Sequence, residues 1–215
     1  MTSLPLWPDA ASRYAVETDH LFIGLLIVTG LTAGLVFVLL IVFGTRYRHT
    51  NAVERGDRVK KSWHWEIGWT AATMAGFLGL FVWAADLYAR LYQPPAGSIE
   101  IFVTGKRWMW KIEHAGGQRE IDELHIPVGR PIRLVMTSED VIHSFYLPAF
   151  RVKHDVVPGR YQELWFSADE TGDFALFCAE FCGTDHAHMG GHVVVLTAAG
   201  FEDWLRRQPT PGAVK

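Results

Sequence analysis

The chain begins with two long uncharged stretches and continues with short apolar runs separated by turn residues. The uncharged stretches cover residues 21–44 and 67–85. A helix rises about 1.5 Å per residue, so each stretch is long enough to cross a hydrocarbon core of roughly 30 Å. Aromatic residues flank the second stretch on both sides, as they do at the two interfaces of a membrane. We therefore predict a hairpin of two transmembrane helices at residues 21–44 and 66–90.

The segment between the predicted spans, residues 45–62, carries more basic than acidic side chains. The basic residues are Arg46, Arg48, Arg55, Arg58, Lys60 and Lys61, and the acidic ones are Glu54 and Asp57. A basic short loop favours the cytoplasmic side. With that loop in the cytoplasm, residues 1–20 are predicted to lie outside it. The hairpin ends at residue 93, and the residues after it are predicted to lie outside the cytoplasm too. We expect the first span to act as its own insertion signal, because residues 1–20 hold one basic residue and no short apolar core.

The remainder, residues 94–215, has the pattern of an all-β domain. Proline and glycine at residues 94–97 end the second helix. Short runs rich in Val, Ile, Phe and Leu follow, at residues 98–105, 131–138, 161–168, 173–178 and 192–200. A short helix at residues 201–208, closed by Pro209, is the expected exception. The fold predicted is a membrane-anchored all-β protein, with a Greek-key β-sandwich or barrel after the helical hairpin.

The charge of the predicted β domain limits its partners. Residues 96–215 contain 12 Lys and Arg against 16 Asp and Glu, a net charge of −4. A negative domain disfavours nucleic acid and weakly favours a basic partner.

The candidate chemistry lies in residues 177–189, which hold the only two cysteines of the chain. Cys178, Cys182, His186 and Met189 follow one another at spacings of 4, 4 and 3. A disulfide is one interpretation in an oxidising compartment, and structural zinc is another. The imidazole and the thioether favour copper instead, because methionine is the usual weak axial ligand of copper electron-transfer sites. Two thiolates can bridge two copper ions, and that arrangement needs one more histidine, for which His143 is the candidate.

Residues 178–189, CAEFCGTDHAHM, resemble the CxExCGxxHxxM signature of cytochrome c oxidase subunit II. The resemblance extends to residues 139–160, which carry the first copper histidine of that family, to the aromatic segment 105–113 and to WEIGWT at 65–70. It covers nearly the whole chain. It implies a cupredoxin-like domain at residues 94–215, on the periplasmic face of the bacterial inner membrane.

The resemblance also implies a binuclear copper centre, named CuA. It assigns Cys178 and Cys182 as bridges between the coppers, His143 and His186 as one ligand each, and Met189 as a weak ligand. Glu180 contributes its backbone carbonyl to the coppers, and its side chain is expected to bind Mg²⁺ at the contact with subunit I. His188 and His192 are expected to be bystanders.

Further roles follow from the same resemblance. Trp108 is the aromatic through which electrons enter from cytochrome c, whereas Trp110 is expected to pack in the core. Glu66 marks the mouth of a proton pathway that leads into subunit I. Haem, oxygen reduction and proton pumping belong to subunit I, and subunit III is a further expected partner. The donor is expected to be a separate protein, because no C-x-x-C-H haem motif occurs in the chain.

The cytochrome donors of this family are basic, so acidic side chains are the expected docking surface. The acids near the copper loops in the sequence are Glu113, Glu120, Asp122, Glu123, Glu139, Asp140, Asp155 and Asp185. Each alone is an ordinary solvated charge, but several together would steer the encounter. Lys153, Asp155 and Arg160 match a turn of the family near subunit I, and the sequence leaves open whether they contact haem propionates or only each other.

Three rival interpretations were weighed. A quinol oxidase subunit II has the same architecture without the copper ligands, all of which are present here. Nitrous oxide reductase has a similar copper signature, but it needs a large propeller domain and no pair of spanning helices. A membrane-tethered blue copper carrier or copper chaperone would differ in its metal count and would not purify with a haem-bearing subunit.

Overall fold

The computed structural model describes residues 7–53 and 63–208. They fall into two compact units. The β unit comprises residues up to Thr18 together with those from Tyr88 onward, and the helical unit comprises Asp19–Leu87. Several charges of the predicted cytoplasmic loop (Glu54, Arg55, Asp57, Arg58, Lys60 and Lys61) and Pro209 lie outside the described residues.

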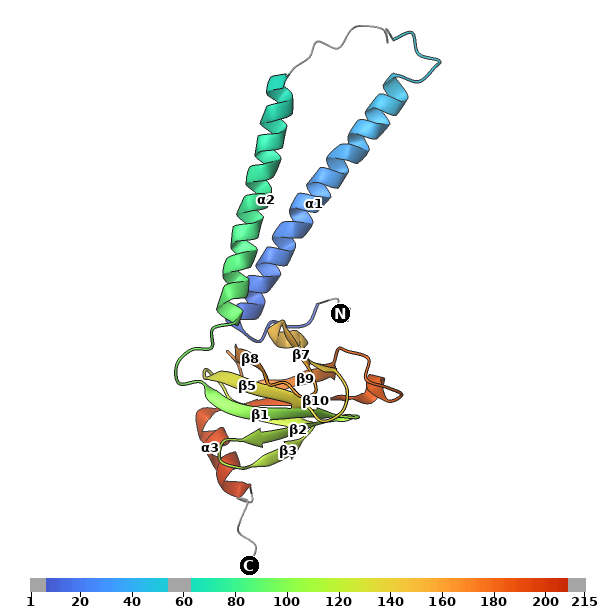
Figure 1. Cartoon of the computed structure of the whole chain (residues 1–215). Helices are drawn as coiled ribbons and strands as arrows, with labels where there is room; N and C mark the ends of the chain where they lie inside the picture. Colours follow the sequence, from blue (N-terminus) through green and yellow to red (C-terminus); the bar gives the residue numbers. More distant parts are fainter. Residues whose placement is uncertain (1–6, 54–62, 209–215) are drawn as a thin grey trace, which may run out of the picture. The chain divides into compact units, whose positions relative to one another are not determined.

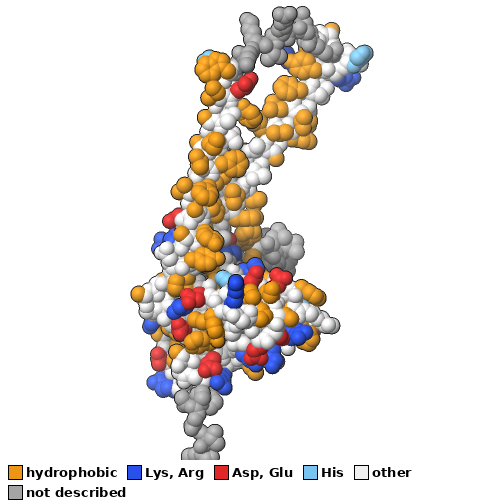
Figure 2. Space-filling view, viewed as in Figure 1, with side chains coloured by type: hydrophobic (Ala, Val, Ile, Leu, Met, Phe, Trp, Pro, Cys, Tyr) orange, Lys and Arg blue, Asp and Glu red, His pale blue; other side chains and the backbone are white. Residues whose placement is uncertain are grey.

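Two long helices correspond to the predicted spans. They are α1, Arg13–Arg46, and α2, Trp63–Leu91 (Figure 1). Both are long and apolar enough to cross a membrane. Their apolar side chains are largely exposed along the helical unit, as Figure 2 shows, and a lipid-facing surface has this composition. Each helix extends beyond its predicted span, because the polar flanks continue the helical hydrogen bonding.

The β unit is a sandwich of two five-stranded sheets, so the predicted fold class is confirmed. The first sheet has the order β3-β2-β1-β5-β8 and the second β4-β10-β9-β6-β7. The strands of the first sheet are β1 Ile99–Lys106, β2 Met109–His114, β3 Arg119–Ile121, β5 Pro131–Ser138 and β8 Gln162–Ser167. Those of the second are β4 Glu123–Pro127, β6 His143–Leu147, β7 Val152–Val156, β9 Gly172–Cys178 and β10 Gly190–Leu196. The pairs β1–β5 and β4–β10 are parallel, and the other pairs are antiparallel.

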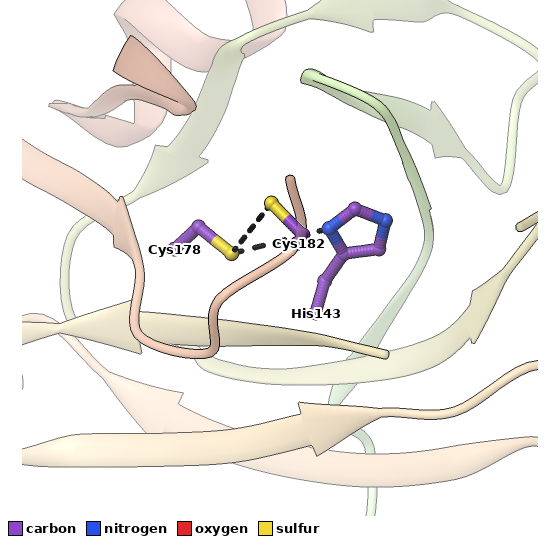
Figure 3. A group of neighbouring side chains, drawn as sticks. All are labelled: His143, Cys178 and Cys182. Carbon is purple, nitrogen blue, oxygen red and sulfur yellow. Dashed lines mark hydrogen bonds between the residues drawn. The ribbon is translucent and has the colours of Figure 1, made fainter. Parts of the chain in front are cut away.

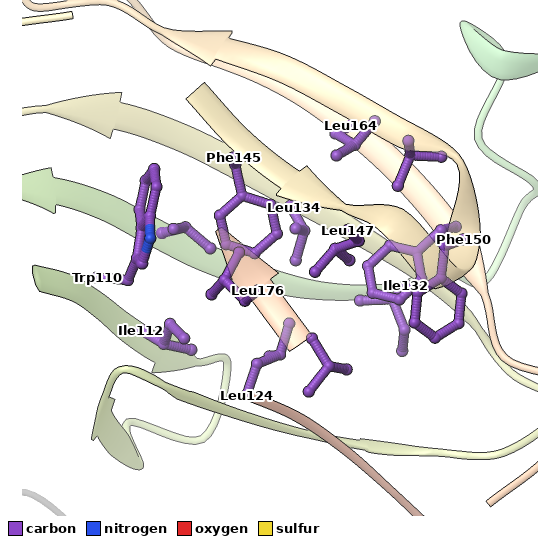
Figure 4. Packing of buried hydrophobic residues seen from close by; sticks show 14 of the residues in the cluster. Trp110, Ile112, Leu124, Ile132, Leu134, Phe145, Leu147, Phe150, Leu164 and Leu176 are labelled. Carbon is purple, nitrogen blue, oxygen red and sulfur yellow. The ribbon is translucent and has the colours of Figure 1, made fainter. Parts of the chain in front are cut away.

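The core lies between the two sheets (Figure 4). Along β5 every second residue is buried, so Ile132, Leu134 and Met136 point inward, as the alternation predicts. Trp110 is fully buried and packs edge-on against Phe145, which confirms its expected place in the core. A core packed from both faces holds the loops at the strand ends in fixed positions.

Three short helical segments complete the β unit. They are η1 Pro148–Phe150, η2 His186–His188 and α3 Ala198–Arg207. The prediction of a strand as far as residue 200 was wrong, because the hydroxyl of Thr197 accepts the Gly200 N–H, 3.1 Å away, and starts α3 there. Phe201 and Trp204 form the buried face of α3.

The segment before α1 belongs to the β unit. Ala11 is buried in the sandwich core, its N–H donates to the Ala149 carbonyl, and its own carbonyl accepts the Asp169 N–H. Arg151 donates to the carbonyls of Pro8 and Asp9. The sequence pattern gave no sign of this packing, because a single buried alanine leaves no periodic signal.

Candidate metal centre

The pairing of β6 with β9 brings together two regions that are 35 residues apart in the sequence. Phe145 on β6 lies opposite Cys178, the last residue of β9. The chain remains paired just beyond the strand, where the Ala179 N–H donates to the Ser144 carbonyl at 2.9 Å. His143, at the start of β6, therefore lies beside the loop that follows Cys178.

The pairing of β9 with β10 closes that loop at its other end. Phe177 lies opposite Gly190, and the Cys178 N–H donates to the Met189 carbonyl at 3.0 Å. Within the loop, the Met189 N–H donates to the His186 carbonyl and forms the turn of η2. The spacing of 4, 4 and 3 in the sequence thus becomes a closed loop whose side chains converge.

The six predicted ligand residues meet around the two cysteine sulfurs. The Cys178 Sγ lies 3.9 Å from the Cys182 Sγ and 3.9 Å from His143 Nδ1. Figure 3 shows the three side chains turned toward one another. The Glu180 carbonyl oxygen is 3.3 Å from the Cys178 Sγ. The Cys182 Sγ is 3.5 Å from His186 Nδ1 and 3.6 Å from Met189 Sδ.

The donor set fits copper better than the alternatives. Both cysteines are free, and their sulfurs are much farther apart than the roughly 2.05 Å of a disulfide. Burial and the neighbouring Cys178 raise the pKa of the Cys182 thiol to about 12, so a bound cation must displace its proton. Two thiolates, two imidazoles and a thioether are soft and borderline donors, which favour copper over Mg²⁺ or Ca²⁺.

Asp140 fixes the orientation of His143. His143 is fully buried, and its Nε2 lies 2.8 Å from Asp140 Oδ1. An Nε2–H that donates to this carboxylate leaves the Nδ1 lone pair facing Cys178. Burial raises the pKa of Asp140, but hydrogen bonds from the Arg107 and Val141 N–H groups and from His143 outweigh it, so the pKa lies below its usual range. The carboxylate is therefore charged when it accepts from His143.

Gly105 on β1 supplies the space for the His143 ring. A Cβ on Gly105 would lie 2.9 Å from Cδ2 of His143, closer than non-bonded carbon atoms approach, and 3.2 Å from Cγ of the same ring. Trp110 packs edge-on against the same ring at 5.9 Å between centroids. The sequence gave no role to Gly105, and it placed Asp140 on the docking surface. In the structure the Asp140 side chain is 18% exposed and bonds to His143, three residues further on.

The other predicted site residues lie in different environments. Trp108 is 36% exposed and lies against Gly183 in the segment of residues 178–189, which we call the copper loop. The side chain of Glu180 is exposed, so it does not contribute to the sulfur cluster. Glu66 lies in the first turn of α2, in the helical unit.

The expectation that Glu120 belongs to an exposed docking surface was wrong. Its side chain is 6% exposed and lies between His114 and His125.

Lys153 and Asp155, which match the family turn, contact each other. They form an ion pair with 2.8 Å between Nζ and Oδ1, and the Ser144 hydroxyl also donates to Asp155.

Comparisons with known proteins point to one family. The family described as cytochrome C oxidase subunit II, periplasmic domain, matches residues 114–197. The alternative cytochrome c oxidase subunit 2 of Bradyrhizobium diazoefficiens is 29% identical, over 95% of this chain and 84% of that protein. The cytochrome c oxidase subunit 2 of Thermostichus vulcanus is 37% identical, over 54% of this chain and 35% of that protein.

A solved structure is similar to the β unit as well. It is the periplasmic domain of subunit II of cytochrome oxidase from Bradyrhizobium japonicum, with 35% identity and a TM-score of 0.52. The match covers 54% of this chain and 96% of that domain. Sequence and fold thus point to the same family.

Proposed function

The chain belongs to the cytochrome c oxidase subunit II family, and from this premise we propose that it accepts electrons from cytochrome c at a binuclear copper centre. The electrons then pass to the haem centres of subunit I, where oxygen is reduced to water with proton pumping. The observation that carries the proposal is that two free thiols, two imidazoles and a thioether converge at one place. Four of these side chains come from residues 178–189, and the fifth, His143, comes from the start of β6.

We assign the ligands from these contacts. Cys178 and Cys182 would bridge the two ions, and His143 and His186 would bind one ion each through Nδ1. Met189 and the Glu180 carbonyl would be the weaker ligands. When bound, the copper pair would take up and release one electron at a time.

The protein's own contribution is rigidity. His143 is held by Asp140 and by the packing of Gly105 and Trp110, and the cysteine loop is tied at both ends by backbone hydrogen bonds. Ligands that are fixed before the metal binds need not move when its charge changes, so the reorganisation that accompanies electron transfer stays small.

Electrons would enter through Trp108. Its side chain is partly exposed and contacts the copper loop at Gly183, the residue after Cys182. An aromatic ring that joins the surface to the ligand loop is a short route between a docked haem and the metal. Exposed Phe181 and Phe177, on the same loop and on β9, offer apolar contact area for the donor.

Acidic side chains would steer a basic cytochrome c toward this surface. Asp185 is exposed in the copper loop, although it also contacts His188. Glu139 is exposed too, but it pairs with Lys106 and Lys111, and Glu113 pairs with Arg119. The steering would therefore come from the net negative charge of the β domain, not from single unpaired acids. We expect this steering to weaken with added salt.

The remaining roles are proposed on family membership. The exposed Glu180 carboxylate is free of the sulfur cluster and could bind Mg²⁺ together with subunit I. Glu66, in the first turn of α2, would begin the proton pathway. With the loop between the helices in the cytoplasm, both termini and the copper domain would lie on the periplasmic side of the bacterial inner membrane. Subunit III would be a further partner in the complex.

Rapid mixing tests the electron-transfer role. Reduced cytochrome c is mixed with the copper-loaded full chain in detergent, and oxidation of its haem is followed optically. We expect fast oxidation at low ionic strength and slower oxidation as salt is added, with metal-free protein as the control. Oxidation no faster than with metal-free protein would contradict the proposal.

A further inference from the structure

A second cluster of metal-ligand side chains lies where the chain passes from β3 to β4. It consists of Glu120, Glu123 and His125, each with one donor atom within 4.8 Å of the others. We propose that this cluster binds a divalent cation of the zinc class, at a site separate from the copper loops. The proposal is independent of the electron-transfer function.

A sharp change of direction at Asp122 creates the cluster. Asp122 has a φ of 60°, and it exchanges two hydrogen bonds with Trp110, whose N–H donates to Oδ1 at 2.7 Å. The Asp122 carbonyl also accepts the His192 N–H at 2.8 Å. The chain thereby leaves one sheet and joins the other between Glu120 and His125, and the two side chains turn toward each other.

The carboxylate of Glu120 is already oriented as a ligand. One oxygen, Oε1, lies 2.7 Å from His114 Nε2 and accepts the His125 N–H at 3.1 Å. The other oxygen, Oε2, contacts His125 Nδ1. Metal-binding carboxylates are typically held by such outer hydrogen bonds, which fix the ligand before the ion arrives.

The imidazole of His125 is fixed as well. Its ring stacks on the indole of Trp204 from α3, with 4.7 Å between centroids and 14° between planes. The same indole contacts the His114 ring at 4.9 Å. A cation bound to His125 and Glu120 would therefore also strengthen the attachment of α3 to the sandwich.

The donor types decide which ion fits. Imidazole nitrogen and carboxylate oxygen are both donor types that Zn²⁺ accepts, and three protein ligands leave the remaining position for water. Ca²⁺ prefers six to eight oxygen ligands, and Cu(I) prefers sulfur. Glu123 is exposed, so the cluster opens to solvent and an ion can reach it. On binding, the proton through which His125 Nδ1 contacts Glu120 would move to Nε2 or be released to solvent, and the Nδ1 lone pair would then bind the ion.

Calorimetric titration of Zn²⁺ into the copper-loaded full chain in detergent tests the proposal. We expect one Zn²⁺ per chain, with the copper absorbance unchanged and a raised midpoint of thermal unfolding. His125→Gln and Glu123→Gln remove ligands and should weaken binding, and His114→Gln removes an outer contact, which typically costs about 10- to 100-fold in affinity.

The matched control is His192→Gln. His192 also pairs with a carboxylate through Nδ1, with 2.8 Å to Asp173, but both side chains are exposed and lack a third ligand in the described part of the chain. Its substitution should leave Zn²⁺ binding unchanged. Saturable binding that survives Glu123→Gln undiminished, or no saturable binding at all, would overturn the proposal. Since Glu123 is exposed, its variant keeps the test decisive even if His125→Gln does not fold.

Discussion

The indole of Trp108 lies directly against Gly183, the residue that follows Cys182. A Cβ on Gly183 would lie 3.4 Å from both Cζ2 and Nε1 of the indole, and Gly183 has a φ of 128° that other residues rarely adopt. The backbone conformation therefore favours glycine at this position, and the indole packs within van der Waals reach of the copper loop. The contact joins a partly exposed side chain to the proposed metal ligands.

Trp108→Phe should slow electron input from cytochrome c while the copper spectrum stays intact. Phenylalanine keeps an apolar ring but loses the larger indole surface that contacts Gly183. The rate of haem oxidation after rapid mixing measures the effect. Trp165→Phe, a half-buried tryptophan on β8 away from the copper loop, is the control. Unchanged electron input in Trp108→Phe would remove its assigned role.

Gly105→Ala should impair copper binding by displacing His143. The added Cβ would meet the imidazole at 2.9 Å, so the fully buried ring would have to shift within a packed core. Copper per chain after loading and gel filtration measures the loss. Gly30→Ala, in a helix position where a Cβ meets nothing within 4 Å, should load normally. Full copper content in Gly105→Ala would show that the ring can adjust.

Asp140→Ala should weaken copper retention about 10- to 100-fold, the usual effect of removing a partner that orients a ligand histidine. Asp140→Asn keeps an acceptor oxygen for His143 and should retain more copper than the alanine variant. Competition with a copper chelator gives the relative affinities. Glu139→Ala removes the adjacent carboxylate, which pairs with the exposed Lys106 and Lys111, and serves as the control. Equal affinities in Asp140→Ala and Glu139→Ala would contradict the orienting role.

Asp155 should contribute a pH-dependent part of the stability. Hydrogen bonds from Lys153 and Ser144 lower its pKa below the ordinary 3.8. Its contribution is therefore complete above 3.8 and is lost as the pH falls through the lower pKa of the folded state. Denaturant unfolding of the unaltered chain and of Asp155→Asn should differ most near neutral pH and converge in acid. A difference that stays constant with pH would count against this account.

Local spacing and long-range packing differed in how far the sequence could predict them. The ligand loop from Cys178 to Met189 was predictable because its residues are close in sequence and chemically distinctive. Five strands, β2, β3, β4, β6 and β7, were not among the predicted apolar runs. All five are six residues or shorter, and β6 is buried at four of its five positions and shows no alternation. The role of Gly105 could not be recognised from the sequence. It arises because β1, in one sheet, passes close to His143 on β6, in the other sheet.

The burial of Glu120 was not predicted either, although its residue type and position were known. A glutamate in a polar segment is usually a surface charge, and the sequence analysis treated it as one. The turn at Asp122 directs it inward between two histidines, and α3 covers the cluster with Trp204. Neither the turn nor the distant tryptophan is visible in the local pattern, so the burial of Glu120 could only come from the fold.

The binuclear copper centre is tested most directly by electron paramagnetic resonance of the copper-loaded full chain, together with its copper content. The account predicts two coppers per chain and one unpaired electron shared equally between them, bridged by Cys178 and Cys182. A spectrum from a single isolated copper, or a disulfide between the two cysteines in metal-loaded protein, would contradict it.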